Sequence, residues 1–238
     1  MDLKDKVIII TGASAGIGEA TARLLAKEGA RLALVARSPA KLAALEKELP
    51  GAHAIVADMS KPADVHAMIA AAQKHFGHID VLVNNAGQGL YGPLEHINLD
   101  DFAAVWQLNV VGPLAAMEAV IPLMRAQGGG TIINISSMVS KNAIPNLAGY
   151  TSTKYALNAL SLTARAELAS DNIAVTLVHP SLTATDFGKN ARRAAGTEHM
   201  VPRNRPDMPA ADSAELVAGK ILEAIKNGAS GPAEIIWR

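Results

Sequence analysis

The sequence predicts an α/β fold in which a doubly wound sheet of about seven parallel strands is flanked by helices on both faces. Three observations support this prediction. Short runs rich in valine and isoleucine alternate with longer stretches of helical period. That alternation is typical of βαβ units, whose strands are buried on both faces. A chain of 238 residues, half of them hydrophobic, is long enough to bury such a sheet within one domain.

Each predicted strand is a short apolar run bounded by turn residues or by a stretch of helical period. Most of these runs are dominated by β-branched residues, which favour strands. Together they supply enough strands for the whole sheet. The runs are Val7–Ile10, Leu32–Ala36, His53–Ala57, Val81–Asn84, Thr131–Ser136, Ala174–Val178 and Glu234–Trp237.

The helices between these runs begin and end at recognisable signals. Ser38 supplies a capping hydroxyl and Pro39 occupies the first helical position, so a helix is predicted directly after them. Glycine and asparagine follow the longer stretches and end them. The predicted helices are Glu19–Glu28, Ala40–Leu49, Leu99–Gln127 and Tyr150–Ala169.

Periodicity fades between Leu182 and about Asp212, where prolines, glycines and arginines interrupt the pattern. We expect this segment, about 182–212, to be a mobile lid over a substrate site. No linker or repeat divides the chain, so residues 1–238 are predicted to form a single domain. Two interpretations remain open for the arginines of the lid, an anionic-substrate site or a solvated surface: Arg192, Arg193, Arg203 and Arg205.

Composition argues against several classes of function. Lys and Arg number 22, as do Asp and Glu, so no overall positive field favours nucleic acid or an anionic membrane. The chain has no cysteine, which excludes thiolate chemistry and fits a cytoplasmic protein. His75 and His78 could suggest a metal site, but Gly77 and Asp80 mark a loop there and the remaining histidines are not at the spacing of ligands, so no metal is expected. We also expect no signal peptide and no membrane helix, because Leu114–Met124 is too short to span a bilayer.

A glycine-rich turn joins the first strand to the first helix. It reads Thr11-Gly12-Ala13-Ser14-Ala15-Gly16-Ile17-Gly18. Glycine is needed where a side chain would block the chain reversal, keep the backbone from a phosphate or hold the helix off the sheet. The N-terminus of the helix offers free N–H groups and the positive end of its dipole to an anion. The turn indicates a dinucleotide site, with a glycine-rich connection that binds nothing as the alternative.

Three motifs together resemble the short-chain dehydrogenase/reductase family, and the resemblance covers nearly the whole chain. Thr11–Gly18 resembles its TGxxxGxG cofactor turn, Asn84-Asn85-Ala86-Gly87 its NNAG motif, and Tyr150–Lys154 its YxxxK motif. The resemblance implies a Rossmann-type fold and an oxidoreductase that uses a nicotinamide cofactor on CH–OH and C=O groups. It implies cofactor contacts from Gly12, Ser14, Ala15, Gly16, Ile17, Gly18, Asn85, Ala86, Gly87, Tyr150, Lys154 and Pro180.

The end of the second strand favours NADP(H) over NAD(H). It reads Leu34-Val35-Ala36-Arg37-Ser38, without the acid that binds the adenosine ribose in NAD sites. The guanidinium of Arg37 can bind two oxygens of a 2′-phosphate, and Ser38 can donate one more hydrogen bond. The alternative is an exposed surface arginine without a ligand. Asp58, after the third strand, either contacts the adenine, as the resemblance implies, or caps a helix.

Tyr150 and Lys154 have the spacing that proton transfer to a reduced ketone requires. The alkoxide left by hydride transfer needs a proton, and a phenol with a pKa of about 10 needs nearby positive charge to supply it near neutral pH. Four residues apart on a helix, the two side chains leave the same face. Alone, such a pair is more often a packed ring and a solvated amine.

The family resemblance assigns a role to each of four residues. Tyr150 is implied to be the general acid in reduction and the base in oxidation, with Lys154 lowering its pKa and binding the nicotinamide ribose. Ser137, thirteen positions before Tyr150, is implied to hydrogen-bond the substrate oxygen. Asn109 is implied to hold a water that links Lys154 to solvent. Outside the family context, Ser137 could be a turn hydroxyl and Asn109 a buried amide beside a kink.

The chain departs from the family pattern after the sixth strand. It reads His179-Pro180-Ser181 where the family usually has Pro-Gly. Ser181 is therefore expected to shift this loop slightly or to impose a different φ. Thr183 and Thr185 both resemble the family's threonine contact to the nicotinamide carboxamide, and the sequence does not choose between them.

We expect a carbonyl reductase that uses NADP(H) on a hydrophobic ketone or aldehyde, with the substrate itself left open. The competing class is a non-catalytic NADP(H)-binding regulator that senses redox state, and a structural module with an empty cofactor site is a third alternative. The resemblance implies a homo-oligomer, a tetramer or a dimer, built from the two long helices. The expected walls of the substrate pocket are Gln88, Tyr91, Val139, Leu182 and Phe187.

Overall fold

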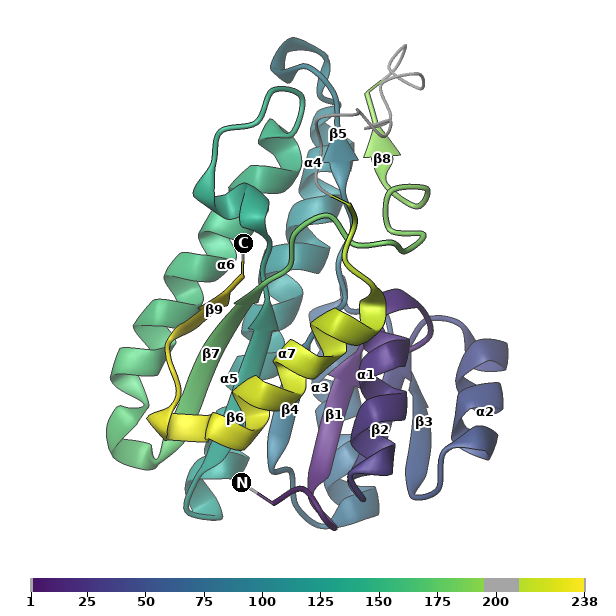
Figure 1. Cartoon of the computed structure of the whole chain (residues 1–238), viewed down its shortest axis with the longest axis vertical. Helices are drawn as coiled ribbons and strands as arrows, with labels where there is room; N and C mark the ends of the chain where they lie inside the picture. The colour runs from purple at the N-terminus through teal and green to yellow at the C-terminus, as the bar shows by residue number, and fades with distance from the viewer. Residues whose placement is uncertain (1, 195–209, 238) are drawn as a thin grey trace.

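The computed structural model describes residues 2–194 and 210–237 of the chain. Within these ranges, seven parallel strands form one sheet in the order β3-β2-β1-β4-β6-β7-β9 (Figure 1). The order reverses between β1 and β4, which makes the ends of these two strands the topological switch point of the sheet. The predicted doubly wound parallel sheet is confirmed.

Every strand bound lies within one residue of its predicted position. Ile8 and Ile10 of the first strand face one hydrophobic layer, whereas Val7 and Ile9 face the other, so the strand is buried on both sides. This burial explains the continuous apolar runs in the sequence. The strands are β1 (Val7–Thr11), β2 (Arg31–Ala36), β3 (Ala52–Val56), β4 (Val81–Asn84), β6 (Gly130–Ile135), β7 (Ile173–His179) and β9 (Glu234–Ile236).

Helices cover both faces of the sheet (Figure 1). One apolar layer unites the sheet with α1 (Gly16–Lys27), α2 (Pro39–Glu48) and α7 (Ala214–Asn227). The other unites it with α3 (Pro62–Phe76), α5 (Gly112–Ala126) and α6 (Ala148–Glu167). The three-layer arrangement leaves the carboxyl ends of the strands free to carry a site.

The helix predicted over Leu99–Gln127 is interrupted. The structure divides it into α4 (Leu99–Trp106), a π-helical turn η2 (Gln107–Val111) and α5. Pro113 has no N–H to continue the α-helical pattern, and Gly112 lies so close to Met59 that an added Cβ would be 2.2 Å from its carbonyl oxygen. The wider turn accommodates both.

The segment Leu99–Ala126 is long and apolar enough to cross a membrane by length and composition alone. Half of its most apolar window is buried inside the protein. Such burial is what the core helix of a folded domain shows.

A second, two-stranded sheet was not predicted. β5 (Leu90–Tyr91) pairs in parallel with β8 (Arg192–Arg193), which belongs to the segment expected to be a lid (Figure 1). A strand of two residues is too short to leave a periodic pattern in the sequence. Residues 195–209 of that segment, which include Arg203 and Arg205, lie outside the described residues.

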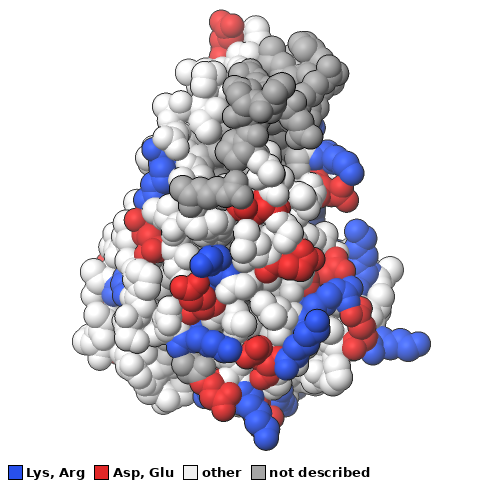
Figure 2. Space-filling view, viewed as in Figure 1, with Lys and Arg blue, Asp and Glu red and all other residues white. Residues whose placement is uncertain are grey.

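Charged side chains of both signs alternate over the face drawn in Figure 2. Lys226 of α7 pairs with Glu28 after α1 at 2.6 Å, and Lys220 pairs with Glu223 at 3.0 Å. Exposed pairs of this kind contribute at most about 1 kcal/mol each. The surface pattern agrees with the balanced charge of the sequence.

Candidate active site

The crevice for a ligand lies where β1 and β4 end. The turn after β1 contains Gly12 with φ +68° and Gly16 with φ +56°, a conformation that side chains other than glycine rarely adopt. An added Cβ at Gly18 would lie 2.3 Å from the carbonyl oxygen of Gly12, so α1 can approach the turn only because this position is glycine. These are the functions expected of the glycines in a turn that carries a pyrophosphate.

Thr11 ties the two loops of the crevice together, a role that sequence reasoning did not assign to it. Its Oγ1 accepts hydrogen bonds from the N–H groups of Asn85 at 2.9 Å and Ala86 at 3.0 Å. The Asn85 amide donates in return to the carbonyl of Thr11 at 2.8 Å. The sequence did offer a signal for this contact, because Thr11 ends β1 and the Asn84-Asn85 pair stands at the end of β4, the neighbouring strand. The glycine turn and Asn85–Gly87 therefore form one rigid edge.

The loop after β7 closes the other side of the glycine turn. Thr185 packs over Gly16, with its Cγ2 3.1 Å from the position of an added Cβ. A cleft of about 570 Å³ opens here, lined by residues of the turn, α1 and this loop, among them Ala15, Gly16, Glu19, Thr185 and Asp186. Thr183 instead hydrogen-bonds the Ser181 carbonyl at 3.0 Å. The geometry thus brings Thr185 closer to the cofactor turn than Thr183.

Ser181, where the family usually has glycine, forms contacts that glycine cannot. Its hydroxyl donates to the carboxylate of Asp212 at 2.7 Å, and the indole of Trp237 donates to the same oxygen at 2.8 Å. The φ of Ser181 is not positive, so the serine introduces no strained backbone at this position. The preceding Pro180 accepts a hydrogen bond from the N–H of Met138 at 2.9 Å. The serine therefore ties the loop after β7 to the segment before α7.

Arg37 is exposed at the end of β2, beside Asp58. Burial raises the pKa of Asp58, but hydrogen bonds from Ser60 and the charges of Arg37 and Lys61 outweigh it and lower the pKa. The Asp58 carboxylate accepts from the Ser60 N–H at 3.0 Å and hydroxyl at 2.8 Å, whereas the N-cap of α3 is Lys61, so Asp58 closes a turn and is not the cap of the helix. Ser38 precedes α2 without a capping bond from its side chain.

Tyr150 is buried near the start of α6, with 7% of its surface exposed. Its phenol hydrogen-bonds Ser137, and the ring of Phe187 lies 5.6 Å away. Burial raises the pKa of Tyr150 well above its usual value, the neighbouring Tyr91 adds to this, and the Ser137 contact opposes it. An additional positive charge is needed before this phenol can exchange a proton near neutral pH.

Lys154 lies one turn further along α6 and is 4% exposed. Its ammonium is 5.8 Å from the centre of the Tyr150 ring and donates to the carbonyl of Ile135 at 2.8 Å. Burial lowers the pKa of Lys154 to about 8. The spacing in the sequence therefore does place the amine under the phenol, in a site with little water.

Asn109 lies in the π-helical turn and is fully buried. Its Oδ1 accepts from the N–H of Gln88 at 2.9 Å, and its amide donates to the Gln88 carbonyl at 2.9 Å and to the Thr153 hydroxyl at 3.1 Å. An added Cβ at Gly87 would lie 3.3 Å from Asn109 Oδ1 and 3.7 Å from Lys154 Nζ. The side chain that was expected to hold a water thus fixes the Gly87–Gln88 backbone beside Lys154.

The predicted pocket walls are only partly brought together. Tyr91 and Phe187 both lie beside Tyr150, and Val139 donates its N–H to the Ser137 hydroxyl at 3.3 Å. The Gln88 side chain donates to the Asn190 carbonyl at 2.7 Å, toward the small sheet. Leu182 is 45% exposed. Of the predicted walls, Tyr91 and Phe187 therefore lie beside Tyr150, and the backbone of Val139 lies beside Ser137.

The two arginines of β8 hold the small sheet in place. Arg192 forms an ion pair with Asp101 of α4 and donates to the Gln88 side chain at 3.2 Å. Arg193 lies over the Tyr91 ring at 5.7 Å and donates to the Ala191 carbonyl at 3.2 Å. Of the two interpretations offered for the lid arginines, these contacts favour a structural role for Arg192. Arg193 is brought beside Tyr91 by the pairing of β5 with β8, two segments that are distant in the sequence.

The two candidate metal histidines point to different partners. His75 stacks on His53 with ring centres 3.9 Å apart, whereas His78 pairs with Asp80 at 3.0 Å. Within residues 2–194 and 210–237, no group of three histidine or acidic side chains is arranged to hold a metal ion.

Comparison with known proteins adds to this geometry. Residues 6–196 match the model of the family described as short chain dehydrogenase. A curated relative, an uncharacterised oxidoreductase of Staphylococcus saprophyticus, is 39% identical over 192 residues, which cover 78% of this chain and 77% of that protein.

Two solved structures are similar over almost the whole length. One is a 3-ketoacyl-(acyl-carrier-protein) reductase from Brucella melitensis complexed with NADH, with a TM-score of 0.86, 30% identity and coverage of 98% of this chain and 96% of that one. The other is an alcohol dehydrogenase from Thermococcus sibiricus complexed with 5-hydroxy-NADP, with a TM-score of 0.85, 29% identity and coverage of 99% and 97%.

Proposed function

Because the chain belongs to the short-chain dehydrogenase family of oxidoreductases, we propose that it is a carbonyl reductase that uses NADP(H) on a ketone, an aldehyde or a secondary alcohol. One observation carries the proposal. The phenol of Tyr150 hydrogen-bonds Ser137 in a buried site, with the Lys154 ammonium one helical turn away and the glycine-turn crevice beside them. A non-catalytic NADP(H)-binding regulator would not need this buried proton-transfer group.

The glycine turn, Arg37 and the edge at Asn85–Gly87 would hold the dinucleotide. The nicotinamide supplies or accepts the hydride when it is bound. Ser137 and the Tyr150 phenol would both hydrogen-bond the carbonyl oxygen of the substrate, which orients it. Tyr150 then donates its proton to the oxygen as negative charge develops there, and recovers it in the reverse direction. Lys154 stabilises the phenolate through its positive charge.

The rate of reduction is expected to fall as the pH rises through about 8, the value to which burial lowers the pKa of Lys154. The ammonium that stabilises the phenolate is present below this pH and lost above it. The measurement is kcat for reduction across about pH 6 to 10. Lys154→Met, which has no amine to titrate, should be slow throughout and should lack this limb. A wild-type profile that stays flat through pH 8 would contradict the role of Lys154.

Arg37 is the basis for proposing NADP(H). It is exposed at the end of β2, where an acid would repel the 2′-phosphate, and a guanidinium can bind two phosphate oxygens. Arg37→Glu is expected to weaken NADPH binding about 10- to 100-fold, the equivalent of a charged hydrogen bond of about 1.5–3 kcal/mol. Binding of NADH should be maintained.

Titration of both cofactors by fluorescence measures this preference. Lys47→Glu is the matched control, because it makes the same charge change in the last turn of α2, away from the crevice. Tighter binding of NADH than of NADPH by the wild-type protein would show that Arg37 does not select the cofactor.

The substrate proposed is a hydrophobic ketone or aldehyde, since the aromatic rings of Tyr91 and Phe187 lie beside Tyr150. The test follows the loss of NADPH absorbance with a panel of ketones, aldehydes, sugars and charged acids. Turnover of the apolar carbonyls supports the proposal, and turnover of sugars or acids alone refutes the substrate class. Tight NADPH binding without any turnover would favour the redox-sensing regulator.

Three further proposals concern the context of the enzyme. We propose a cytoplasmic homo-oligomer, a tetramer or a dimer, in which α4, α5 and α6 pair through exposed apolar residues such as Leu114, Tyr155 and Leu162. Light scattering that gives the 24.7 kDa mass of one chain would refute the oligomer. Residues 182–194 and 210–212, the described part of the predicted lid, are proposed to cover the substrate. Hydrogen exchange of their amides that does not change when a substrate binds would argue against that role.

A further inference from the structure

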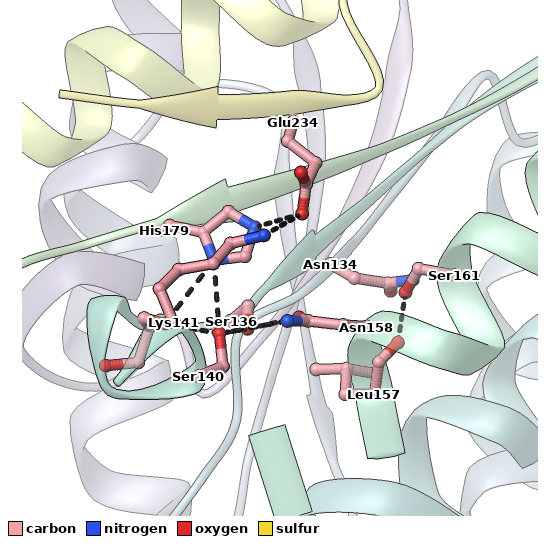
Figure 3. A network of polar contacts seen from close by, with 10 residues as sticks. Asn134, Ser136, Ser140, Lys141, Leu157, Asn158, Ser161, His179 and Glu234 are labelled. Carbon is pink, nitrogen blue, oxygen red and sulfur yellow. Dashed lines mark hydrogen bonds and ion pairs between the residues drawn. The ribbon is translucent and has the colours of Figure 1, made fainter. Parts of the chain in front are cut away.

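His179, the last residue of β7, is fully buried behind Ser137. Its Nδ1 lies 3.3 Å from the Ser137 carbonyl oxygen and 3.3 Å from Ser140 Oγ. Its Nε2 lies 3.1 Å from a carboxylate oxygen of Glu234 on β9 (Figure 3). The ring therefore connects the C-terminal strand with the backbone of the proposed catalytic serine.

The carboxylate that holds the ring is itself anchored. Lys141 donates to the same Glu234 oxygen at 2.6 Å, and Figure 3 shows the ammonium beside the imidazole. Lys141 belongs to η3 (Met138–Lys141), the 3₁₀ turn that Ser137 caps, so the anchor and the serine are parts of one short segment. Among the described residues, Glu234 and Lys141 are the charged groups that face the ring.

A count of hydrogens shows which ring nitrogen must be a donor. Ser140 has one hydroxyl hydrogen, and its contact of 2.6 Å to the Ser137 carbonyl takes it. Ser140 Oγ also accepts from the amide of Asn158 at 2.9 Å. The Nδ1 atom of His179 therefore faces two acceptors, the Ser137 carbonyl and the Ser140 oxygen. Such a position is satisfied only when Nδ1 carries a hydrogen.

Protonation at the second nitrogen depends on its surroundings. Burial lowers the pKa of His179, and the Lys141 ammonium acts in the same direction, while the Ser137 carbonyl and the Glu234 carboxylate oppose them. The Nδ1 hydrogen is required both in the neutral ring and in the doubly protonated ring. The bond from Nδ1 to Ser137 therefore does not need a charged ring, whereas the contact between Nε2 and the Glu234 carboxylate is a hydrogen bond only in the doubly protonated ring.

We propose that His179, anchored by Glu234, is a positioning residue that holds Ser137 by donating a hydrogen bond from Nδ1 to its carbonyl oxygen. This inference rests on the proposed function, in which the Ser137 hydroxyl orients the substrate oxygen. Ser137 follows the end of β6, and its backbone is extended, with φ −168°. Rotation of the Ser137–Met138 peptide is the local motion that would move the hydroxyl away from Tyr150. The hydrogen bond from His179 Nδ1 to the carbonyl oxygen of this peptide opposes that rotation.

Two substitutions distinguish the hydrogen bond of Nδ1 to Ser137 from the contact of Nε2 with Glu234. In His179→Asn the side-chain amide can take the place of Nδ1, and in His179→Gln the longer side chain places its amide near Nε2. The asparagine variant is expected to keep most of kcat. The glutamine variant is expected to lose about 10- to 100-fold in kcat, because a reacting group that is slightly misplaced reacts much more slowly. KM and NADPH affinity should stay unchanged in both, and equal values of kcat for the two variants would overturn the proposal.

Ser161→Ala is the control for general loss of stability. Ser161 accepts a hydrogen bond from Asn134 at 2.8 Å in the same buried region (Figure 3), and among the described residues its hydroxyl donates to the Leu157 carbonyl and not to Ser137. This variant should unfold more easily than the wild type and keep its kcat. A loss of kcat in Ser161→Ala as large as in His179→Gln would show that both act only through stability.

The ring nitrogen of His179 that carries the hydrogen can be identified by a measurement that does not depend on enzymatic activity. Nitrogen chemical shifts of a ¹⁵N-labelled imidazole distinguish the two ring nitrogens, and the signal of His179 is the one that His179→Asn removes. A protonated Nδ1 at neutral pH supports the contact with Ser137. A bare Nδ1 with hydrogen only on Nε2 overturns the proposal, whether or not the protein turns over a carbonyl. A wild-type protein that reduces no carbonyl refutes the proposed function instead, so the two failures are distinguishable.

Discussion

Tyr150→Phe is expected to lower kcat about 1,000-fold or more, since a positioned general acid contributes about 10²- to 10⁴-fold and Phe has no proton to give. The change removes one oxygen from a buried ring, so packing against Phe187 is kept. Ser137 loses the contact with the phenol but keeps the hydrogen bond from the Val139 N–H at 3.3 Å. Binding of NADPH should remain within the range of the wild type, because the dinucleotide is held mainly by the glycine turn and Arg37. The measurement compares kcat and the NADPH dissociation constant of the two proteins.

Tyr155→Phe provides the matched control on the same helix. Tyr155 is 49% exposed on α6 and lies outside the crevice, so the same chemical change there should leave kcat unaltered. If Tyr150→Phe retained a tenth or more of the wild-type kcat, another group would have to protonate the alkoxide, and the proposed mechanism would be wrong.

Gly18→Ala is expected to destabilise the fold by about 3 kcal/mol and to abolish measurable NADPH binding, because overpacking against rigid backbone has few ways to relax. The new Cβ would lie 2.3 Å from the Gly12 carbonyl oxygen and 2.6 Å from the Asn85 amide nitrogen. Alanine gains about 1 kcal/mol over glycine in a helix, which is smaller than the cost of this clash. Urea unfolding gives the free energy, and fluorescence titration gives the affinity.

Gly219→Ala separates the clash from the helix propensity. Gly219 lies inside α7, and an added Cβ there meets nothing within 4 Å. Without a clash, this substitution should stabilise the protein by about 1 kcal/mol. A Gly18→Ala protein as stable as the wild type, with unchanged affinity for NADPH, would mean that the turn moves freely and does not form a fixed cradle.

The features that could be predicted from the sequence are those indicated by a pattern within a few neighbouring residues. Tyr150 and Lys154 could be paired because a helix places residues four apart on one face, and the glycines of the turn because they follow a strand and precede a helix. The strands could be located because burial on both faces requires continuous apolar runs. Each of these inferences depends on a few neighbouring positions, so the amino-acid sequence by itself determined the fold class, while the family resemblance of its motifs supplied the candidate catalytic group.

Other features depend on segments that are distant in the chain. The π-helical turn that carries Asn109 results from the contact of Gly112 with Met59, and Arg193 reaches Tyr91 only because β8 pairs with β5. Ser181 departs from the family pattern, and the contacts that explain it come from Asp212 and Trp237, which are distant in the sequence. His179 gave no signal, since a histidine at the end of a strand shows neither Glu234 nor the Ser137 carbonyl. Only the tertiary structure decided these contacts, because hydrogen bonding and close packing act between atoms in space, whatever their separation along the chain.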